Sequence, residues 1–208
     1  TQNITLSGVI LLQNKVYVTN GSTITILPGT ILRGDASTQG SLIITKGSKI
    51  IAEGTETNTI VFTSNQPVGN RAEGDWGGLV ILGQATNNQP GGVANIEGIV
   101  PTTNTQYGGN DDNDNSGTLK YVRIEFGGYV YATNSEINGL TMGAVGRGTT
   151  IDYVQVSHTN DDAFEWFGGS VNCKHLVSYR NLDDDFDTDN GFNGNVQFCL
   201  SVRDPQVA

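Results

Sequence analysis

The chain has 208 residues, which is enough for one domain with a sizeable core. Eleven Lys and Arg residues against 21 Asp and Glu residues give a formal net charge of −10. This sign is wrong for neutralising phosphates, so the composition argues against a nucleic-acid partner. No apolar run approaches the roughly 20 residues that cross a bilayer, and we expect no membrane span in this chain.

Glycine makes up 28 of the 208 residues, about twice its usual share of roughly 7%. Such a composition favours a β fold rich in turns. The two cysteines, Cys173 and Cys199, are too few for a disulfide framework and lack the spacing of metal ligands, so we expect two buried thiols.

The N-terminal part contains an internal repeat. Gly-Ser-Thr-Ile-Thr-Ile-Leu-Pro-Gly at 21–29 is followed by Gly-Ser-Leu-Ile-Ile-Thr-Lys-Gly-Ser at 40–48. Each copy begins a unit of two short β-branched runs separated by a glycine turn, and the alternation of residue types directs one face inward. One unit cannot bury its apolar face alone, so repeats of about 20 residues predict a stacked solenoid.

The C-terminal part repeats with the same period. Val-Gln-Val-Ser-His at 154–158 aligns with His-Leu-Val-Ser-Tyr at 175–179 and with Phe-Cys-Leu-Ser-Val at 198–202. An earlier run, Val-Arg-Ile-Glu-Phe at 122–126, fits the same frame. This alignment predicts an inward ladder of Ile124, Val156, Val177 and Leu200, and an outward set of Glu125, Ser157, Ser178 and Ser201.

No segment sustains the apolar stripe of a helix. Short strands repeating about every 20 residues predict an all-β fold, a right-handed, single-stranded parallel β-helix over residues 1–208, with a β-sandwich as the alternative. Residues 84–118 lose the period and fill with Asn, Gln, Gly, Thr and Asp, which predicts a long surface excursion. Solenoids need polar caps, and none is visible near Ala208, so we expect the natural chain to continue.

Four motifs give the chain a recognisable family resemblance. They are Gly-Asp-Trp-Gly-Gly-Leu-Val-Ile-Leu-Gly at 74–83, Tyr-Val-Arg-Ile-Glu-Phe-Gly-Gly at 121–128, Asp-Asp-Ala-Phe-Glu-Trp-Phe-Gly-Gly at 161–169 and Asp-Asp-Asp-Phe-Asp-Thr-Asp-Asn-Gly at 183–191. With them the chain resembles a family of exported, often lipid-anchored bacterial envelope proteins with a pectate-lyase-like β-helix. The resemblance covers nearly the whole chain and implies an extracellular or cell-surface location. It implies fold and location more than activity.

Two acidic segments are candidate Ca²⁺ sites, because this ion prefers several carboxylate and carbonyl oxygens that converge at a tight turn. In the first, Asp185, Asp187 and Asp189 alternate before Gly191; a solvated acidic turn is the alternative. In the second, Asp112 and Asp114 begin a D-x-D-x-S-G pattern that lacks the downstream Glu of a calcium loop. An Asn/Asp turn explains this second segment equally simply.

Stacking of the coils would also place Asp161, Asp162 and Glu165 beside Asp183, Asp184 and Asp187. Equivalent carboxylates would then lie roughly 5 Å apart. That crowding would raise their pKa values, and a bridging cation would relieve it.

The same acids support an enzymatic alternative, a polysaccharide lyase or glycoside hydrolase. Its catalytic set would be His158, Asp161, Asp162, Arg180 and Asp184. The Gly-His-Gly and Arg-Ile-Lys signatures of polygalacturonases, which share this fold, are absent. His158 aligns with Phe126 and Tyr179, which favours a packed histidine over a catalytic one.

Aromatic side chains near the acids, Trp166, Tyr129 and Tyr131, are candidates for stacking on sugars, with core packing as the alternative. These residues are compatible with three functions. The first is a structural or adhesive surface module, stabilised by Ca²⁺ and in contact with polysaccharide or other cell-surface components. The others are a carbohydrate-binding module and the lyase or hydrolase.

Overall fold

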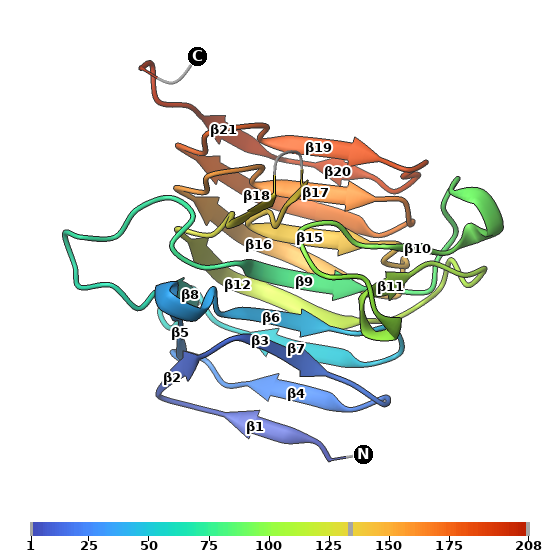
Figure 1. Ribbon diagram of the computed structural model, residues 1–208, viewed down its shortest axis with the longest axis horizontal. Helices are drawn as coiled ribbons and strands as arrows, with labels where there is room; N and C mark the ends of the chain where they lie inside the picture. The colour runs from blue at the N-terminus through green and yellow to red at the C-terminus, as the bar shows by residue number, and fades with distance from the viewer. Residues whose placement is uncertain (1, 133–134, 207–208) are drawn as a thin grey trace.

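The computed structural model describes residues 2–132 and 135–206 and shows a right-handed parallel β-helix. Strands stack from the N-terminus at one end to the C-terminus at the other (Figure 1). An 11-stranded and a 6-stranded sheet, both with parallel pairing, nearly close round an axis. Parallel pairing throughout both sheets excludes the alternative β-sandwich, whose sheets are antiparallel.

The first three coils each contribute three short strands. They are β1 (Ile4–Leu6), β2 (Val9–Leu12), β3 (Lys15–Val18), β4 (Thr23–Ile26), β5 (Ile31–Gly34), β6 (Ser41–Ile44), β7 (Lys49–Glu53), β8 (Ile60–Ser64) and β9 (Gly78–Leu82). In the next three coils the first two strands merge into one long bent strand, whereas the last coil has two short strands again. The later strands are β12 (Gly117–Glu125), β15 (Leu140–Gly143), β16 (Thr150–Ser157), β17 (Phe164–Phe167), β18 (Asn172–Tyr179), β19 (Phe186–Asp189), β20 (Val196–Gln197) and β21 (Leu200–Val202).

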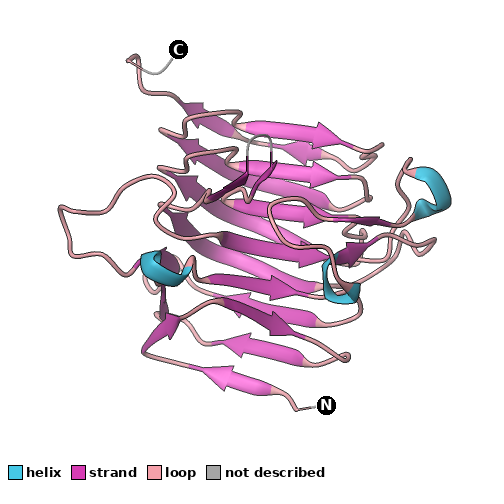
Figure 2. Cartoon of the chain, viewed as in Figure 1, coloured by secondary structure: helices cyan, strands magenta, loops and turns pink. Residues whose placement is uncertain are grey.

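Two antiparallel hairpins and three short 3-10 helices interrupt the coils in the described part of the chain (Figure 2). The hairpins pair β10 (Ala94–Asn95) with β11 (Gln106–Tyr107) and β13 (Val130–Ala132) with β14 (Ser135–Glu136). The 3-10 helices are η1 (Ala36–Thr38), η2 (Pro90–Gly92) and η3 (Thr103–Thr105). No helix within 2–132 and 135–206 is long and apolar enough to cross a membrane.

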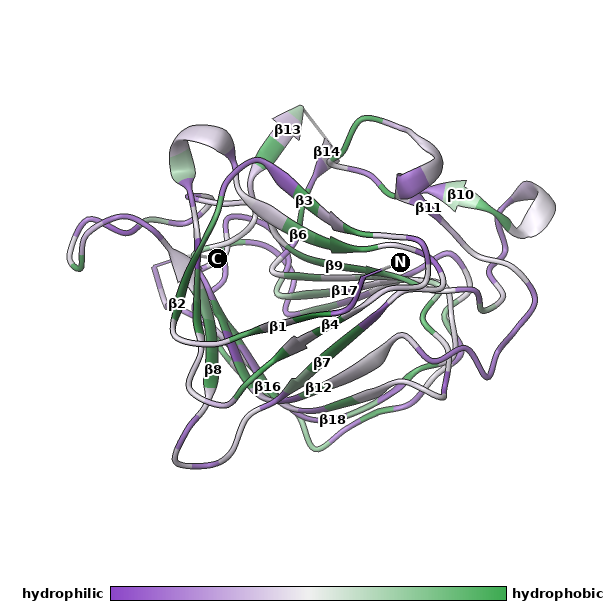
Figure 3. Ribbon diagram, turned by 90° about the horizontal axis from the view of Figure 1, so that it is seen from below, coloured by the Kyte–Doolittle hydropathy of each residue, from purple (hydrophilic) through white to green (hydrophobic). Residues whose placement is uncertain are grey.

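Alternate strand residues fill the interior between the sheets. Viewed along the stack, the strands that surround this interior contain many hydrophobic residues (Figure 3). Large interior side chains include Phe62, Trp76 and Phe164, all fully buried. The Trp76 indole stacks on Phe62 and donates a hydrogen bond of 2.8 Å to the carbonyl oxygen of Glu125. Gly34 makes room for it, since a Cβ there would lie 2.4 Å from the Cβ of Trp76.

The excursion after β9 does more than cross the surface. Ile96, Ile99 and Tyr107 pack on the outer face of the six-stranded sheet, against Ile43 and Val80. The central strands β6, β9 and β15 of this sheet are therefore buried on both faces. Polar composition predicted the excursion, but its few apolar residues form a second core.

The predicted inward ladder is correct at Ile124 and Val156 and wrong beyond them. These two residues pair in register and are both buried. Val156, however, pairs with Ser178, and Val177 pairs with Gln155. Ser178 is fully buried, whereas Leu200, which pairs with Val177, is 55% exposed.

The error is one residue. Matching the Val-Ser letters aligned residue 156 with residue 177, but the strands pair residue 156 with residue 178. A shift of one residue moves every side chain to the other face. Ser178, expected outside, is thus buried, and Leu176 opposite Val154 belongs to the interior. Ser157, also expected outside, is buried at the end of β16 although it pairs with Glu125 as predicted. Of the two cysteines expected to be buried, Cys173 is buried and Cys199 is exposed.

Candidate functional site

The outer face of the six-stranded sheet changes chemistry along the stack. One outward column runs in register through Ile43, Val80, Thr141, Glu165 and Asp187. The apolar members lie under the excursion, whereas the two acids lie on β17 and β19 in the later coils. This column therefore becomes acidic beyond Thr141, whereas Phe167 on β17 still packs against Tyr107 of the excursion.

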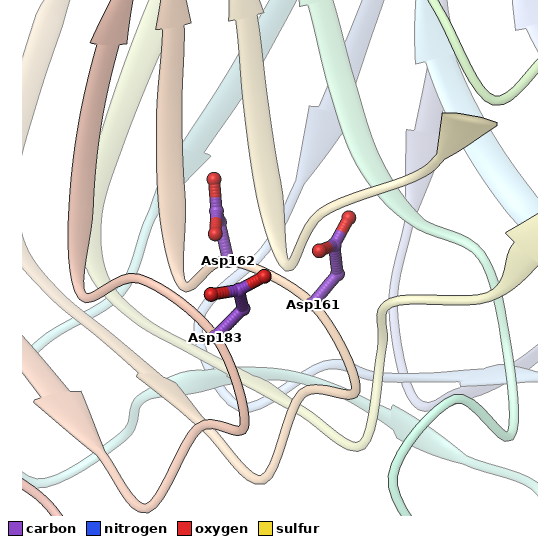
Figure 4. Close-up of side chains that lie close together, drawn as sticks. All are labelled: Asp161, Asp162 and Asp183. Carbon is purple, nitrogen blue, oxygen red and sulfur yellow. The ribbon is translucent and has the colours of Figure 1, made fainter. Parts of the chain in front are cut away.

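The turns that lead into these two strands add four aspartates. Asp161 and Asp162 precede β17, and Asp183 and Asp184 precede β19 one coil later. The backbone N–H of Asp184 donates to Oδ1 of Asp162 at 2.9 Å, which ties the two turns together. The carboxylates of Asp161, Asp162 and Asp183 point toward a common space (Figure 4).

These residues form an open pocket of about 280 Å³. All of its lining residues are acidic: Glu97, Glu136, Asp161, Asp162, Glu165, Asp183, Asp184, Asp187 and Asp189. Sequence reasoning identified the residues from the two repeated coils but missed Glu97 and Glu136. Those two come from the excursion and from the β13–β14 hairpin, where no periodic pattern indicates which side chains turn toward the sheet.

Two groups of three carboxylates lie close enough to share a cation. In the first, Asp161, Asp162 and Asp183 each offer an oxygen within 4.8 Å of the others. In the second, Asp162, Glu165 and Asp187 do the same. Asp162 belongs to both groups. The proximity expected from stacked coils is confirmed for these acids.

The crowding of like charges is visible in the pKa values. Burial, and then the charges of Glu97 and Asp162, raise the pKa of Glu165 to about 10. Burial, and then Asp161, raise that of Asp162 to about 8. The pKa values of Asp161 and Glu97 rise to about 6 and about 7, again mainly through burial. The pocket lacks the positive charge that would hold these groups ionised.

A buried amide adjoins the pocket. Asn138 is fully buried, and its Nδ2 donates to Oε2 of Glu165 and to Oγ1 of Thr141. Its Oδ1 has no hydrogen-bond partner. A buried polar atom without a partner costs free energy.

Of the three aspartates in the first predicted metal segment, two line the pocket and one does not. Asp187 and Asp189 line the pocket, but Asp185 does not. The Asp185 carboxylate accepts hydrogen bonds from Ser178, Ser201 and Arg203. These bonds outweigh the effect of its burial and lower its pKa.

In the second predicted metal segment, both carboxylates accept hydrogen bonds from neighbouring residues. Asp112 accepts from the N–H and the hydroxyl of Thr86 at 2.9 and 2.7 Å. Asp114 accepts from Gln84 at 3.2 Å and Ser116 at 2.9 Å. Both carboxylates therefore stabilise the local conformation of the loop, as the alternative of an Asn/Asp turn predicts.

The catalytic set of the enzymatic alternative is split. Asp161, Asp162 and Asp184 line the pocket. The His158 ring instead lies 3.5 Å from Glu73 and stacks on Phe126, and Arg180 lies 3.5 Å from Asp204. The expected basic partners are therefore engaged outside the pocket.

The candidate sugar platforms also occupy different environments. Trp166 is fully buried in the interior and stacks with Phe164, so it cannot face a ligand. Tyr129 is partly buried. Tyr131 is 48% exposed on β13, the strand that pairs with the one carrying Glu136.

Comparison with known proteins agrees with this architecture. Residues 1–207 match the family model described as a pectate-lyase like beta helix domain. Neither the curated proteins nor the solved structures include a match to the chain. On the strength of a match over nearly its whole length, the chain belongs to the pectate-lyase-like β-helix domain family.

Proposed function

We propose that this protein is a non-catalytic structural or adhesive module of the bacterial cell surface, stabilised by Ca²⁺ in its acidic pocket and in contact with polysaccharide. The convergence of nine carboxylates, without a basic residue among the pocket's lining residues, carries the proposal. Ca²⁺ takes six to eight oxygen ligands at about 2.3–2.6 Å and tolerates irregular geometry. Carboxylate oxygens that lie within 4.8 Å of one another meet that requirement.

An inorganic cation fits better than an organic one. The pocket surface is made almost entirely of polar atoms of Asp and Glu side chains. A polyamine or a basic peptide would need apolar surface for its carbon chain, which these residues do not provide. A divalent ion needs only the oxygens.

The positions of the basic groups support a non-catalytic role. A β-helix lyase needs a base within hydrogen-bond reach of the proton that it removes. His158 and Arg180, the expected bases, are paired with Glu73 and Asp204. Contact with polysaccharide rests on the exposed ring of Tyr131 near the pocket.

Ca²⁺ should raise the melting temperature of the purified chain, and a chelator should reverse the effect. A ligand at 100 times its Kd that binds only the native state adds about 2.7 kcal/mol to the free energy of unfolding. Asp162→Asn should abolish most of the shift because Asp162 belongs to both carboxylate groups. Scanning calorimetry with increasing Ca²⁺ measures this.

Glu53→Gln is the matched control, since Glu53 is exposed on β7 and outside the pocket. It should melt and respond to Ca²⁺ like the original chain. Identical melting with Ca²⁺ and with chelator would refute the metal part of the proposal. Retention of the Ca²⁺-loaded chain on immobilised polysaccharides tests the adhesive part, and release of reducing ends or new double bonds would instead establish an enzyme.

A further inference from the structure

Most arginines of this acidic protein are paired with carboxylates. The chain has six arginines, and four of them form ion pairs: Arg123, Arg147, Arg180 and Arg203. Arg33 and Arg71 form none within the described residues. With 21 acidic residues against 11 basic ones, acidic partners are plentiful. Two arginines without one are therefore a feature that the composition does not predict.

These two arginines flank the same residue, Thr63 on β8. Arg33 on β5 pairs with Thr63 in register, so the two side chains are neighbours on one face of the sheet. Arg71 lies in the loop between β8 and β9 (Figure 1), and its Nη1 donates to Oγ1 of Thr63 at 3.2 Å. The fold thus brings two arginine side chains from distant parts of the sequence together around Thr63.

Most of the donors of this arginine pair are unused. The Arg33 guanidinium has no hydrogen-bond partner among residues 2–132 and 135–206; its Nε is buried, whereas its two Nη nitrogens are not. Arg71 donates only to neutral acceptors, from Nη1 to Thr63 and from Nε to the carbonyl oxygen of Gln66 at 3.2 Å. Each guanidinium carries five N–H donors. A partly buried cation without a partner costs free energy, so this arrangement favours a counter-ion.

The carboxylates nearest to the pair in sequence or along the sheet are engaged elsewhere. Asp35 caps the 3-10 helix η1. Asp75 accepts from the hydroxyl of Ser64 at 2.5 Å. Glu125, at the end of β12, pairs with Arg123 at 3.5 Å. Within the part of the chain that the structure describes, the arginine pair therefore has no counter-ion, and a ligand would have to supply one.

We propose that Arg33 and Arg71 bind one oxyanion group, a sulfate, a phosphate or a carboxylate, on the outer face of β5 and β8. Planar guanidinium groups present parallel N–H donors to two oxygens of such a group. The Thr63 hydroxyl accepts from Arg71 and keeps its own O–H to donate. β5 and β8 belong to the 11-stranded sheet, whereas β17 and β19 of the acidic pocket belong to the other sheet. The site is thus independent of Ca²⁺ and of the proposed function.

The first test titrates inorganic sulfate, and separately inorganic phosphate, into the ¹⁵N-labelled full chain at an ionic strength held constant with NaCl. The Nε–H signals of Arg33 and Arg71 should shift and saturate in NMR spectra. Arg33→Gln and Arg71→Gln should each weaken the affinity by about tenfold or more, because hydrogen bonds to charged groups are the strong ones. Arg147→Gln is the matched control: it removes the same charge from an arginine that is paired with Asp112 at 3.6 Å. It should leave the affinity unchanged.

Thermal unfolding separates binding from a structural role of Arg33. In NaCl alone, Arg33→Gln should melt no lower than the original chain, because it removes a cation without a partner. Sulfate should raise the melting temperature of the original chain and of Arg147→Gln more than that of Arg33→Gln, since it binds only the native site. Circular dichroism checks that each variant is folded.

A comparison of free sulfate with sulfated and uncharged dextran distinguishes the two sources of the group. Tighter binding of the sulfated polymer at equal sulfate concentration identifies a substituent of a polymer as the ligand, and equal binding identifies the free ion. Binding of uncharged dextran at the arginine pair would overturn the proposal. So would signals of Arg33 and Arg71 that do not saturate, an equal response of Arg147, or a loss of stability of Arg33→Gln in NaCl.

Discussion

At the scale of single residues, the direction of a side chain depends on strand register. Leu176 and Val177 are neighbours on β18, yet Leu176 is fully buried opposite Val154 and Val177 is partly exposed opposite Gln155. Their apolar character does not distinguish them. Only the pairing with β16 decides which of them contributes to the core.

Alanine at these two positions should therefore have unequal effects. Leu176→Ala removes fully buried methyl groups and should lower the free energy of unfolding by about 2–5 kcal/mol. Val177→Ala should lower it by less than about 1 kcal/mol, because its side chain faces the outside. Urea denaturation of both variants measures the difference. Equal losses, or a larger loss for Val177→Ala, would contradict the register.

At the scale of elements, the long strands bend at one residue each. Tyr121, Tyr153, His175 and Phe198 occupy equivalent bends, with φ between 50° and 58°. Bulky residues seldom adopt this left-handed conformation, which costs about 1–2 kcal/mol for each residue. Their rings stack along the outside of the helix, with centroids 4.7, 4.3 and 5.4 Å apart in that order. Stacking offsets part of the backbone strain.

At this bend, we expect glycine to give a more stable protein than alanine, the reverse of the usual order. In the middle of a regular strand, glycine lowers the stability of the protein by about 0.5–1 kcal/mol relative to alanine. Tyr153→Gly and Tyr153→Ala both remove the ring that lies between Tyr121 and His175. Only alanine keeps the strain at φ 53°, so the glycine variant should be more stable by about 1 kcal/mol. Thermal and urea unfolding test the order, and a more stable alanine variant would show that the bend carries no strain.

At the scale of the whole molecule, the excess negative charge is concentrated at one end of one sheet. Four carboxyl groups in the pocket have pKa values raised to between about 6 and about 10, mainly by burial. Their ordinary values lie near 4. Between these limits the folded chain holds more protons than the unfolded chain, so stability must fall as the pH rises.

In a chelator, the chain should thus melt at a higher temperature at pH 5 than at pH 8. The stabilising contribution is complete below about pH 4 and is lost as the pH passes the raised pKa values. Ca²⁺ should restore the melting temperature at pH 8, and Asp162→Asn should flatten the dependence on pH. A melting temperature in chelator that is higher at pH 8 than at pH 5 would show that the pKa values of these carboxyl groups are not raised in the folded chain.

The sequence by itself determined the fold class and most of the pocket. A repeat of about 22 residues, glycine turns and β-branched runs predict stacked parallel coils. The same repeat aligns Asp161 and Asp162 with Asp183 and Asp184, so their proximity follows from period alone. A repeat in the sequence predicts which residues lie side by side, because each coil of a solenoid contacts mainly the coils next to it.

Only the tertiary structure decided the rest. The pairing of β16 with β18 placed Ser178 rather than Val177 inside, because one residue of register reverses every face. Glu97 and Glu136 reach the pocket from segments without a period, and their position depends on how the excursion and the hairpin pack on the sheet. Trp166, which the sequence left open as a sugar platform, is buried because β17 turns it inward. The positions of these side chains depend on packing between segments far apart in the sequence, which local sequence patterns do not predict.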